Sequence, residues 1–494
     1  MQTDMKHINT KRNATGLFIF LMTMVLVGCQ TTTQTTELPP QETPSVVTAQ
    51  ESFEQIQNTV QRLKKDSQYQ AAILEAHKLL KKYPENRVGY LVLADLYAGQ
   101  SMTEKLSKLV DVLAQKFPNE KGVLLWQVKR EIQQEDFQGA LDLINPLLSD
   151  KTDADSSVAD PEVLYYYGLL KILQNDIEGG KVVMQALRTN DEVSESIRKQ
   201  AGEIATIYDN FSEFSDGKNA HFFALLAKSL IDHQEYVLAK KFAENAGKED
   251  ANYIDAWILS GVANFKVGDF EAALVDLNLA YDQDPLRPET HFFLAETLQK
   301  LRRYTEAALY YEKALENGFE FNDSVTRQLI GIFSRQKKYD KIVQLYERLL
   351  QIEDARADEF IPAINVVLNK QKDPQKALDL AQKIYKKFPK NTVTLNLLAW
   401  AQMDNNLLEE AQKTLDKAFK LEKNNARTFL NQGFLLEKES ELNEAVEWFQ
   451  KSYQRGKETG ESAITNLAAD KYNELVQKVQ ATVSSDLERP TSAP

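Results

Sequence analysis

The sequence predicts an all-α fold, a superhelical solenoid of about eleven helical hairpins closed by a capping helix at its C-terminal end. Apolar residues recur with a helical period from about residue 51 onward. The pattern itself repeats every 34 or 35 residues over seven consecutive units, which is too regular for chance. With only 19 Gly and 14 Pro in 494 residues, most of the chain is free of helix breakers.

Residues 255–285 hold the clearest copy of this unit. Its characteristic positions are occupied by Trp257, Gly261, Ala273, Leu277, Ala280 and Pro285. The small residues let two helices approach closely, and the proline ends the second helix because it has no amide hydrogen and clashes with the preceding turn. This pattern resembles the tetratricopeptide repeat. The resemblance implies a right-handed superhelix that serves as a scaffold for binding other proteins.

The first 28 residues have the pattern of a secretory signal. Three basic residues precede an apolar run from Gly16 to Val27, which is too short to span a bilayer as a mature helix. The following Leu-Val-Gly-Cys resembles the bacterial lipobox, and this implies cleavage after Gly28 and lipidation of Cys29. Cys29 is the only cysteine of the chain, at the one position where this chemistry needs one. The alternative is an ordinary signal peptide with a coincidental cysteine.

Lipidation would decide where the mature chain resides. Two acyl chains are already enough for stable anchoring, at about 0.8 kcal/mol per buried methylene. Gln30 follows the cysteine in place of the aspartate that resembles an inner-membrane retention signal in enteric bacteria. We therefore expect an anchor in the outer membrane, facing the periplasm, if the host has two membranes. An acylated Cys29 leaves no thiol for disulfides or metal binding.

Composition and breaks in the period divide the chain into seven segments. They are a signal peptide (1–28), a disordered tether (29–50), an N-terminal sub-array (51–190), an irregular helix and hinge (191–219), a C-terminal sub-array (220–460), a capping helix (461–483) and a disordered tail (484–494). The period breaks only near residue 150 and within 191–219, and the latter segment is either a hinge or a degenerate repeat. Pro362 is expected to start or kink the first helix of its unit.

Constellations of catalytic residues are scarce. The histidines are scattered, without an HExxH motif or a pair at i, i+4 for a metal. Gly179-Gly180-Lys181 lacks the strand and the spacing of a phosphate-binding loop. We therefore expect no catalytic residues, no metal site and no cofactor, and hence no enzyme. The formal net charge of −13 would repel phosphate backbones, which argues against a nucleic-acid partner.

The concave surface of the array is the candidate binding site. In tetratricopeptide arrays the first helices of the hairpins line this surface, and the register selects Phe265, Lys266, Phe292, Glu296, Lys300, Arg327, Arg335, Trp400, Met403 and Phe434. Aromatic rings with interleaved charges suit an extended peptide. The alternative for each ring is packing between adjacent helices. The lysine and asparagine pair with which related domains hold chaperone C-termini is absent, since Phe292 and Glu296, for example, occupy its positions in one unit.

These observations predict a membrane-anchored envelope scaffold that binds protein partners in its groove. By resemblance to tetratricopeptide lipoproteins, it would recruit a periplasmic protease or a peptidoglycan hydrolase. Two alternatives stay open. One is an assembly factor for a pilus, a secretion channel or an exopolysaccharide export complex. The other is a protein that binds glycan or peptidoglycan, because aromatic rings in a groove also suit sugars.

Overall fold

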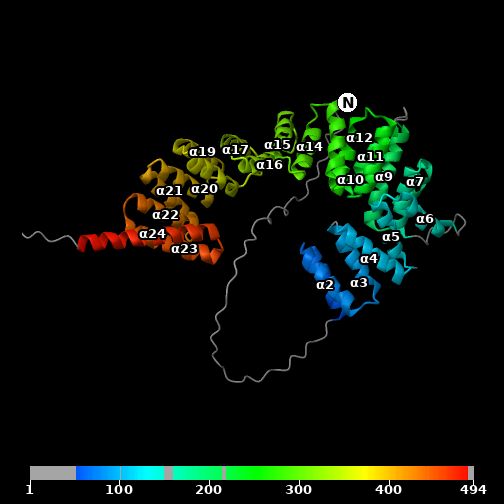
Figure 1. Ribbon diagram of the computed structural model, residues 1–494, viewed down its shortest axis with the longest axis horizontal. Coiled ribbons are helices and arrows are strands. Elements are labelled where there is room, and N and C mark those ends of the chain that lie inside the picture. Colours follow the sequence, from blue (N-terminus) through cyan, green and yellow to red (C-terminus); the bar gives the residue numbers. More distant parts are fainter. Residues whose placement is uncertain (1–51, 101, 119, 150–159, 214–218, 488–494) are drawn as a thin grey trace, which may run out of the picture.

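The computed structural model describes residues 52–100, 102–118, 120–149, 160–213 and 219–487. Throughout these ranges the chain is helical and contains no strand, and successive helices lie side by side along an elongated array (Figure 1). The predicted signal peptide, the tether, and the residues Gly28 and Cys29 lie outside the described residues, as does most of the predicted tail.

Four hairpins and a single helix form the first part of the array. Their bounds are α1 Phe53–Lys65, α2 Tyr69–Lys82, α3 Arg87–Gly99, α4 Thr103–Lys116, α5 Lys121–Gln133, α6 Phe137–Ser149, α7 Pro161–Leu173, α8 Ile177–Thr189 and the single helix α9 Glu195–Glu213.

Seven further hairpins and a final helix follow. Their bounds are α10 Asn219–Asp232, α11 Tyr236–Glu249, α12 Ile254–Val267, α13 Phe270–Gln283, α14 Pro288–Lys300, α15 Tyr304–Glu316, α16 Asn322–Arg335, α17 Tyr339–Leu349, η1 Ala357–Phe360, α18 Ile361–Asn365, η2 Val366–Gln371, α19 Pro374–Lys387, α20 Thr392–Asp404, α21 Leu408–Leu421, α22 Ala426–Lys438, α23 Leu442–Thr459 and α24 Ser462–Leu487. The described residues thus form eleven hairpins, and the prediction of an all-α solenoid is confirmed.

Close approach of two helices explains the small residues of the unit. A Cβ atom at Gly261 on α12 would lie 2.5 Å from Cγ of Leu277 on α13, far inside van der Waals contact. Leu277 and Ala273 are fully buried. The glycine is therefore required by packing between the two helices of this hairpin, as its position in the sequence predicts.

Ten of the hairpin turns in the described residues share a conformation that the composition conceals. Gly268, between α12 and α13, has a φ of 94°, in the left-handed region. The corresponding turns of nine other hairpins place a residue other than glycine at positive φ: Ser67, Glu135, Asn175, Gln234, Arg302, Lys337, Lys372, Asn406 and Ser440. Because a side chain in this region costs about 1–2 kcal/mol, packing of the helices must stabilise these turns.

The hydrophobic core is continuous through the irregular segment that follows α8. Helix α9 packs against α8 and α10. It contributes Ile204, Ala205 and Tyr208 to a buried cluster that extends from Val128 on α5 to Ala263 on α12. A hinge within residues 191–219 stays a prediction, and any motion there has to be reconciled with this shared core.

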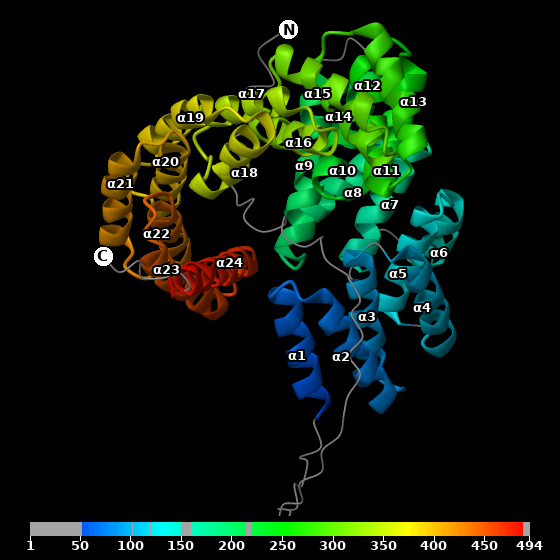
Figure 2. The same cartoon turned by 60° about the vertical axis from the view of Figure 1, so that its left-hand side comes forward.

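Pro362 lies where the array is least regular. The first helix of its unit is divided into a 3₁₀ turn (η1), a short α-helix (α18) with the proline in its first turn, and a π-helical segment (η2). Proline is tolerated in the first turn of a helix, where its missing amide hydrogen leaves no bond unmade. The expected start or kink at this residue is therefore confirmed. Figure 2 shows the hairpins from α12 to α24 following an arc through this unit.

Candidate partner-binding groove

The N-terminal end of the predicted groove residues is on α12. The side chain of Phe265 is half-buried, and its ring meets that of Phe270 edge-on at 5.6 Å between centroids. The neighbouring Lys266 is exposed. On this helix the aromatic residue thus contributes both to packing and to the surface, and the lysine is accessible to a partner.

The three predicted residues of α14 differ in how strongly they are engaged within the chain. The ring of Phe292 stacks on Phe319, with centroids 4.5 Å apart and an interplanar angle of 14°. Glu296 accepts a hydrogen bond of 2.5 Å from the hydroxyl of Tyr311. Burial raises the pKa of Tyr311, and the nearby Glu296 carboxylate raises it further. Lys300, by contrast, is exposed at the end of the helix.

The two arginines of α16 are also unequal. Arg327 donates to Asp323 at 2.9 Å, and two of its nitrogens lie 3.3 Å from the two oxygens of Glu359. Arg335 is exposed, and its guanidinium lies 5.3 Å from the ring centroid of Tyr304. Arg327 therefore links neighbouring repeats, whereas Arg335 offers its donors to solvent or to a partner.

The predicted residues of α20 and α22 form the C-terminal end of the set. Trp400 and Phe434 are half-buried, and Phe434 meets Phe449 edge-on at 5.2 Å. The ammonium group of Lys471 on α24 lies 5.8 Å from the centroid of Phe434. Met403 is 1% exposed and belongs to the core between α20, α21 and α22, so it offers no surface to a ligand.

The predicted groove residues fall into two classes by exposure. The rings of Phe265, Phe292, Trp400 and Phe434 are half-buried, and Lys266, Lys300 and Arg335 are exposed. Such a surface can bury apolar side chains of an extended segment and pair with its carboxylates. Which of these residues contact a partner stays a prediction.

Most of the groove positions on α7 are buried, a feature that the repeat register did not predict. Three of its groove positions, Tyr165, Leu169 and Ile172, are 0–1% exposed, whereas Leu173 is half-buried. The hydroxyl of Tyr166 donates to the Glu235 carboxylate at 2.6 Å, immediately before α11. These three groove positions lack any charged residue, and this feature of the sequence could have indicated that they are buried.

A pair of charged side chains also connects α11 to the turn after α5. We call this pair and the Tyr166–Glu235 hydrogen bond the junction. The ammonium group of Lys240 on α11 lies 2.7 Å from the carboxylate of Glu135, in the turn after α5. Burial raises the pKa of Glu235, although its hydrogen bond with Tyr166 acts in the opposite direction. The Lys240–Glu135 contact joins residues 105 positions apart, and the Tyr166–Glu235 contact joins residues 69 positions apart. The 34-residue period of the sequence could not reveal either contact.

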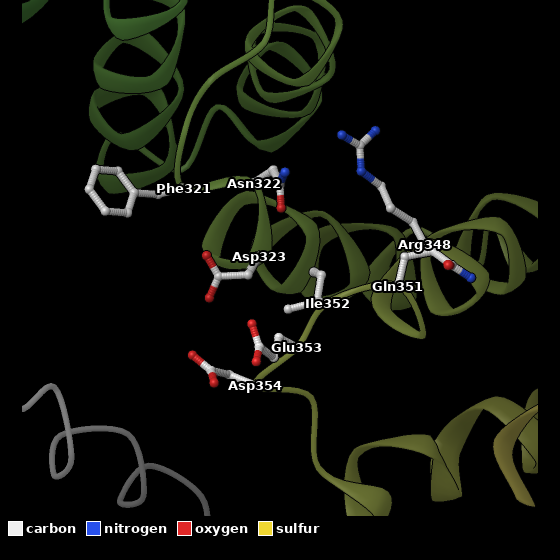
Figure 3. Close-up of a pocket in the computed structure, with 8 residues that line it drawn as sticks. All are labelled: Phe321, Asn322, Asp323, Arg348, Gln351, Ile352, Glu353 and Asp354. Carbon is white, nitrogen blue, oxygen red and sulfur yellow. The ribbon is translucent and has the colours of Figure 1, made fainter. Parts of the chain in front are cut away.

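A separate hollow of about 600 Å³ lies where the loop after α17 passes the start of α16. Figure 3 shows the carboxylates of Asp323, Glu353 and Asp354 together at one end, with Arg348 extending at the other. Within the described parts of the chain, no group of three or more acidic, histidine or cysteine side chains is arranged to hold a metal ion. The same parts contain no helix long and apolar enough to cross a membrane.

The fold is a helical-repeat scaffold of the kind that mediates protein–protein interactions, an architecture that is typically not enzymatic. Comparison with protein families makes this specific: residues 258–318 and 368–429 match models of the tetratricopeptide repeat. The chain thus carries tetratricopeptide repeats, as the pattern in residues 255–285 predicts. No curated protein sequence matches the chain.

Several solved structures are similar to the chain at low identity. Pseudomonas aeruginosa PilF is 23% identical, with a TM-score of 0.28, and the match covers 46% of this chain and 97% of PilF. Yeast Tom70 is 16% identical, with a TM-score of 0.26 and coverage of 88% and 99%. A domain of yeast Sti1, solved as a complex with pHSP90, is 16% identical, with a TM-score of 0.24 and coverage of 52% and 98%.

Proposed function

We propose that this protein is a lipid-anchored scaffold of the bacterial cell envelope that binds an extended segment of a partner protein in the groove of its C-terminal sub-array. The observation that carries the proposal is the exposure of the predicted groove residues, which include half-buried aromatic rings on α12, α14, α20 and α22 and exposed basic side chains on α12, α14 and α16. Aromatic residues and arginine are the side chains that most often dominate binding at protein interfaces.

The burial of most groove positions on α7 supports the assignment to the C-terminal sub-array. An extended peptide needs a run of accessible inner helices, and among the groove positions of α7 only Glu162 and Leu173 are half-buried while the other three are buried. From α12 onward each inner helix of a regular hairpin contributes an accessible aromatic or basic group. A partner segment laid along this arc would contact several repeats at once, which favours a long, extended ligand over a compact one.

The proposed envelope location rests on the sequence around Cys29. A lipid at this residue would hold the array on a membrane, and residues 29–50 would form a tether with a typical span of roughly 25 Å. The array could then reach partners near the membrane surface. We favour a role in recruiting a periplasmic protease or a peptidoglycan hydrolase over a role in assembling a pilus, a secretion channel or an exopolysaccharide export complex.

The anchor and the groove can be tested separately in cells. Cys29→Ala is expected to move the protein from the membrane fraction to the soluble fraction and to abolish labelling by an acyl-chain analogue. Persistent membrane association of this variant would refute the lipid anchor.

Site-specific photo-crosslinking tests the groove. A crosslinker at Lys300 or Arg335 is expected to capture a defined envelope protein, which mass spectrometry identifies, whereas one at the exposed Lys413 on the outer helix α21 is expected to capture none. Trp400→Ala combined with Phe434→Ala should abolish capture at the groove positions. Equal capture from both faces would refute the assignment. If the double variant instead loses retention on purified sacculi, the glycan-binding alternative replaces the proposed one.

A further inference from the structure

The outer surface of the array carries an apolar patch that the groove does not explain. Val275 and Leu279 lie one turn apart on α13 and are 61% and 40% exposed, and Leu309 on α15 is 50% exposed. The two helices are neighbours at this point, since the rings of Tyr281 and Tyr310 are 5.6 Å apart. Figure 2 shows α13 on the outside of the arc, with α12 inside it. We call Val275, Leu279 and Leu309 the outer patch.

The repeat does not require apolar residues at these positions. Val275 and Leu309 are 34 residues apart and occupy the same place in successive hairpins. In most other hairpins this place holds a charged or amide side chain: Lys108, Asp142, Lys241, Gln344, Asp379, Lys413 and Glu447. Leu74 and Val182 are exposed there as well, at 65% and 63%, but each stands in a hairpin whose described neighbours are polar at this place. Two apolar residues in consecutive hairpins therefore mark this region of the outer surface.

Acidic side chains border the outer patch. Glu271 and Asp282 are exposed on α13, and Glu306 and Glu316 are exposed on α15. Glu306 pairs with Arg303 at 2.6 Å, whereas the other three form no salt bridge with the described residues. Lys313, one turn after Leu309, is half-buried and donates to the hydroxyl of Tyr281 at 2.9 Å, so the exposed charges of the border are mainly acidic. A second copy of this chain would bring like charges together, and an anionic membrane surface would be repelled for the same reason.

We propose that the outer patch binds an amphipathic basic helix of a partner protein, with apolar residues on one face and Lys or Arg on both sides of them. The apolar face would cover Val275, Leu279 and Leu309, and its flanking cations would meet the acidic border. This site is on the opposite face of the array from the groove. The scaffold would then hold two partners at once, one in the groove and one on its outer surface, and the second site does not depend on the proposed function of the first.

Fluorescence polarisation with a defined probe tests this proposal. The probe is a labelled 18-residue peptide of Leu and Lys with an amphipathic helical pattern, and the purified full-length mature protein is titrated into it. Leu309→Asp and Val275→Asp are expected to weaken binding at least tenfold. The matched controls Leu74→Asp and Val182→Asp place the same charge at the same repeat position and should leave the affinity within twofold of the unmodified protein.

A charge-reversing substitution provides an independent test that leaves the apolar residues in place. Asp282→Lys should weaken binding of the Leu-Lys probe at least threefold. Raising the salt concentration should reduce the difference in affinity between this variant and the unmodified protein, because exposed charges are screened. Trp400→Ala should have no effect, which separates this site from the groove. Equal weakening by Leu309→Asp and Leu74→Asp would overturn the proposal. So would binding of a Leu-Glu peptide as tight as that of the Leu-Lys probe, or self-association of the protein that Leu309→Asp abolishes.

Discussion

Two glycines in the middle of inner helices are expected to respond oppositely to the same substitution. A Cβ atom added at Gly261 on α12 would lie 2.5 Å from Cγ and 2.9 Å from Cδ2 of Leu277, which is fully buried on α13. A Cβ atom added at Gly331 on α16 would meet nothing within 4 Å. Gly261→Ala and Gly331→Ala therefore differ in packing and share the same change in helix propensity.

The expected magnitudes follow from two opposing effects. Alanine in place of glycine inside a helix stabilises it by about 0.5–1 kcal/mol, because less backbone entropy is lost on folding. Gly331→Ala is expected to show this gain alone. Gly261→Ala also displaces Leu277 within a packed core, and overpacking of this kind costs about 1–3 kcal/mol. The net result is a loss of stability of up to about 2.5 kcal/mol.

The assay has to report on individual repeats, because a solenoid need not unfold in one cooperative step. Native-state hydrogen exchange of amides in α12 and α16, supported by urea titration, gives the local free energies of opening. Leu277→Ala in the Gly261→Ala background relieves the clash and should show a coupling of about 0.5–3 kcal/mol. If Gly261→Ala stabilises α12 as much as Gly331→Ala stabilises α16, the argument from close helix approach is wrong.

Three further predictions concern the junction, a turn and a buried amide. Burial raises the pKa of Glu235, so its favourable contribution to folding is complete below the pKa of the unfolded chain and is lost as the pH rises through the folded pKa. Glu235→Gln should therefore stabilise the junction at pH 7 and not at pH 4, as urea titrations at both values would show. A benefit that does not change with pH would contradict this. Lys337 has a φ of 56°, and Lys337→Gly should raise stability by about 1 kcal/mol in urea titration, whereas a loss would show that the turn is not strained. Asn431 donates to the backbone and side-chain oxygens of Asn396 at 3.0 and 2.9 Å, both of them buried, so Asn431→Ala should cost about 1–3 kcal/mol by hydrogen exchange in α20 and α22. Unchanged exchange there would mean that the bonds contribute nothing.

Local patterns account for the parts of the structure that the sequence predicts well. Each hairpin is stabilised mainly by its own two helices and by its neighbours, so the 34-residue period is enough to predict the hairpins and the packing role of Gly261. Helix ends follow from short-range chemistry, as where Asp269 accepts from the amide of Ala272 at 3.0 Å and begins α13. For the same reason Pro362 could be placed at the start of a helix without knowledge of the rest of the fold.

The candidate site was less predictable because exposure depends on residues far away in the chain. The register selects Met403 and Trp400 equally, but packing of three helices buries the methionine and leaves part of the tryptophan exposed. Likewise, the register selects Phe292 and Arg327 for a partner, but the ring of Phe292 stacks on Phe319 and the guanidinium of Arg327 binds Glu359. A periodic pattern specifies which face a residue occupies, and it does not specify what else covers that face.

By itself the sequence determined a solenoid of helical hairpins and the positions of the turns between them. The tertiary structure decided that Tyr165, Leu169 and Ile172 on α7 are buried, which of the predicted groove residues are exposed, and that Val275 and Leu309 share one outer surface. The physical reason is the range of the interactions. Hairpins form from contacts within one repeat, whereas the bond between Tyr166 and Glu235 joins elements 69 residues apart, and only the folded chain brings them together.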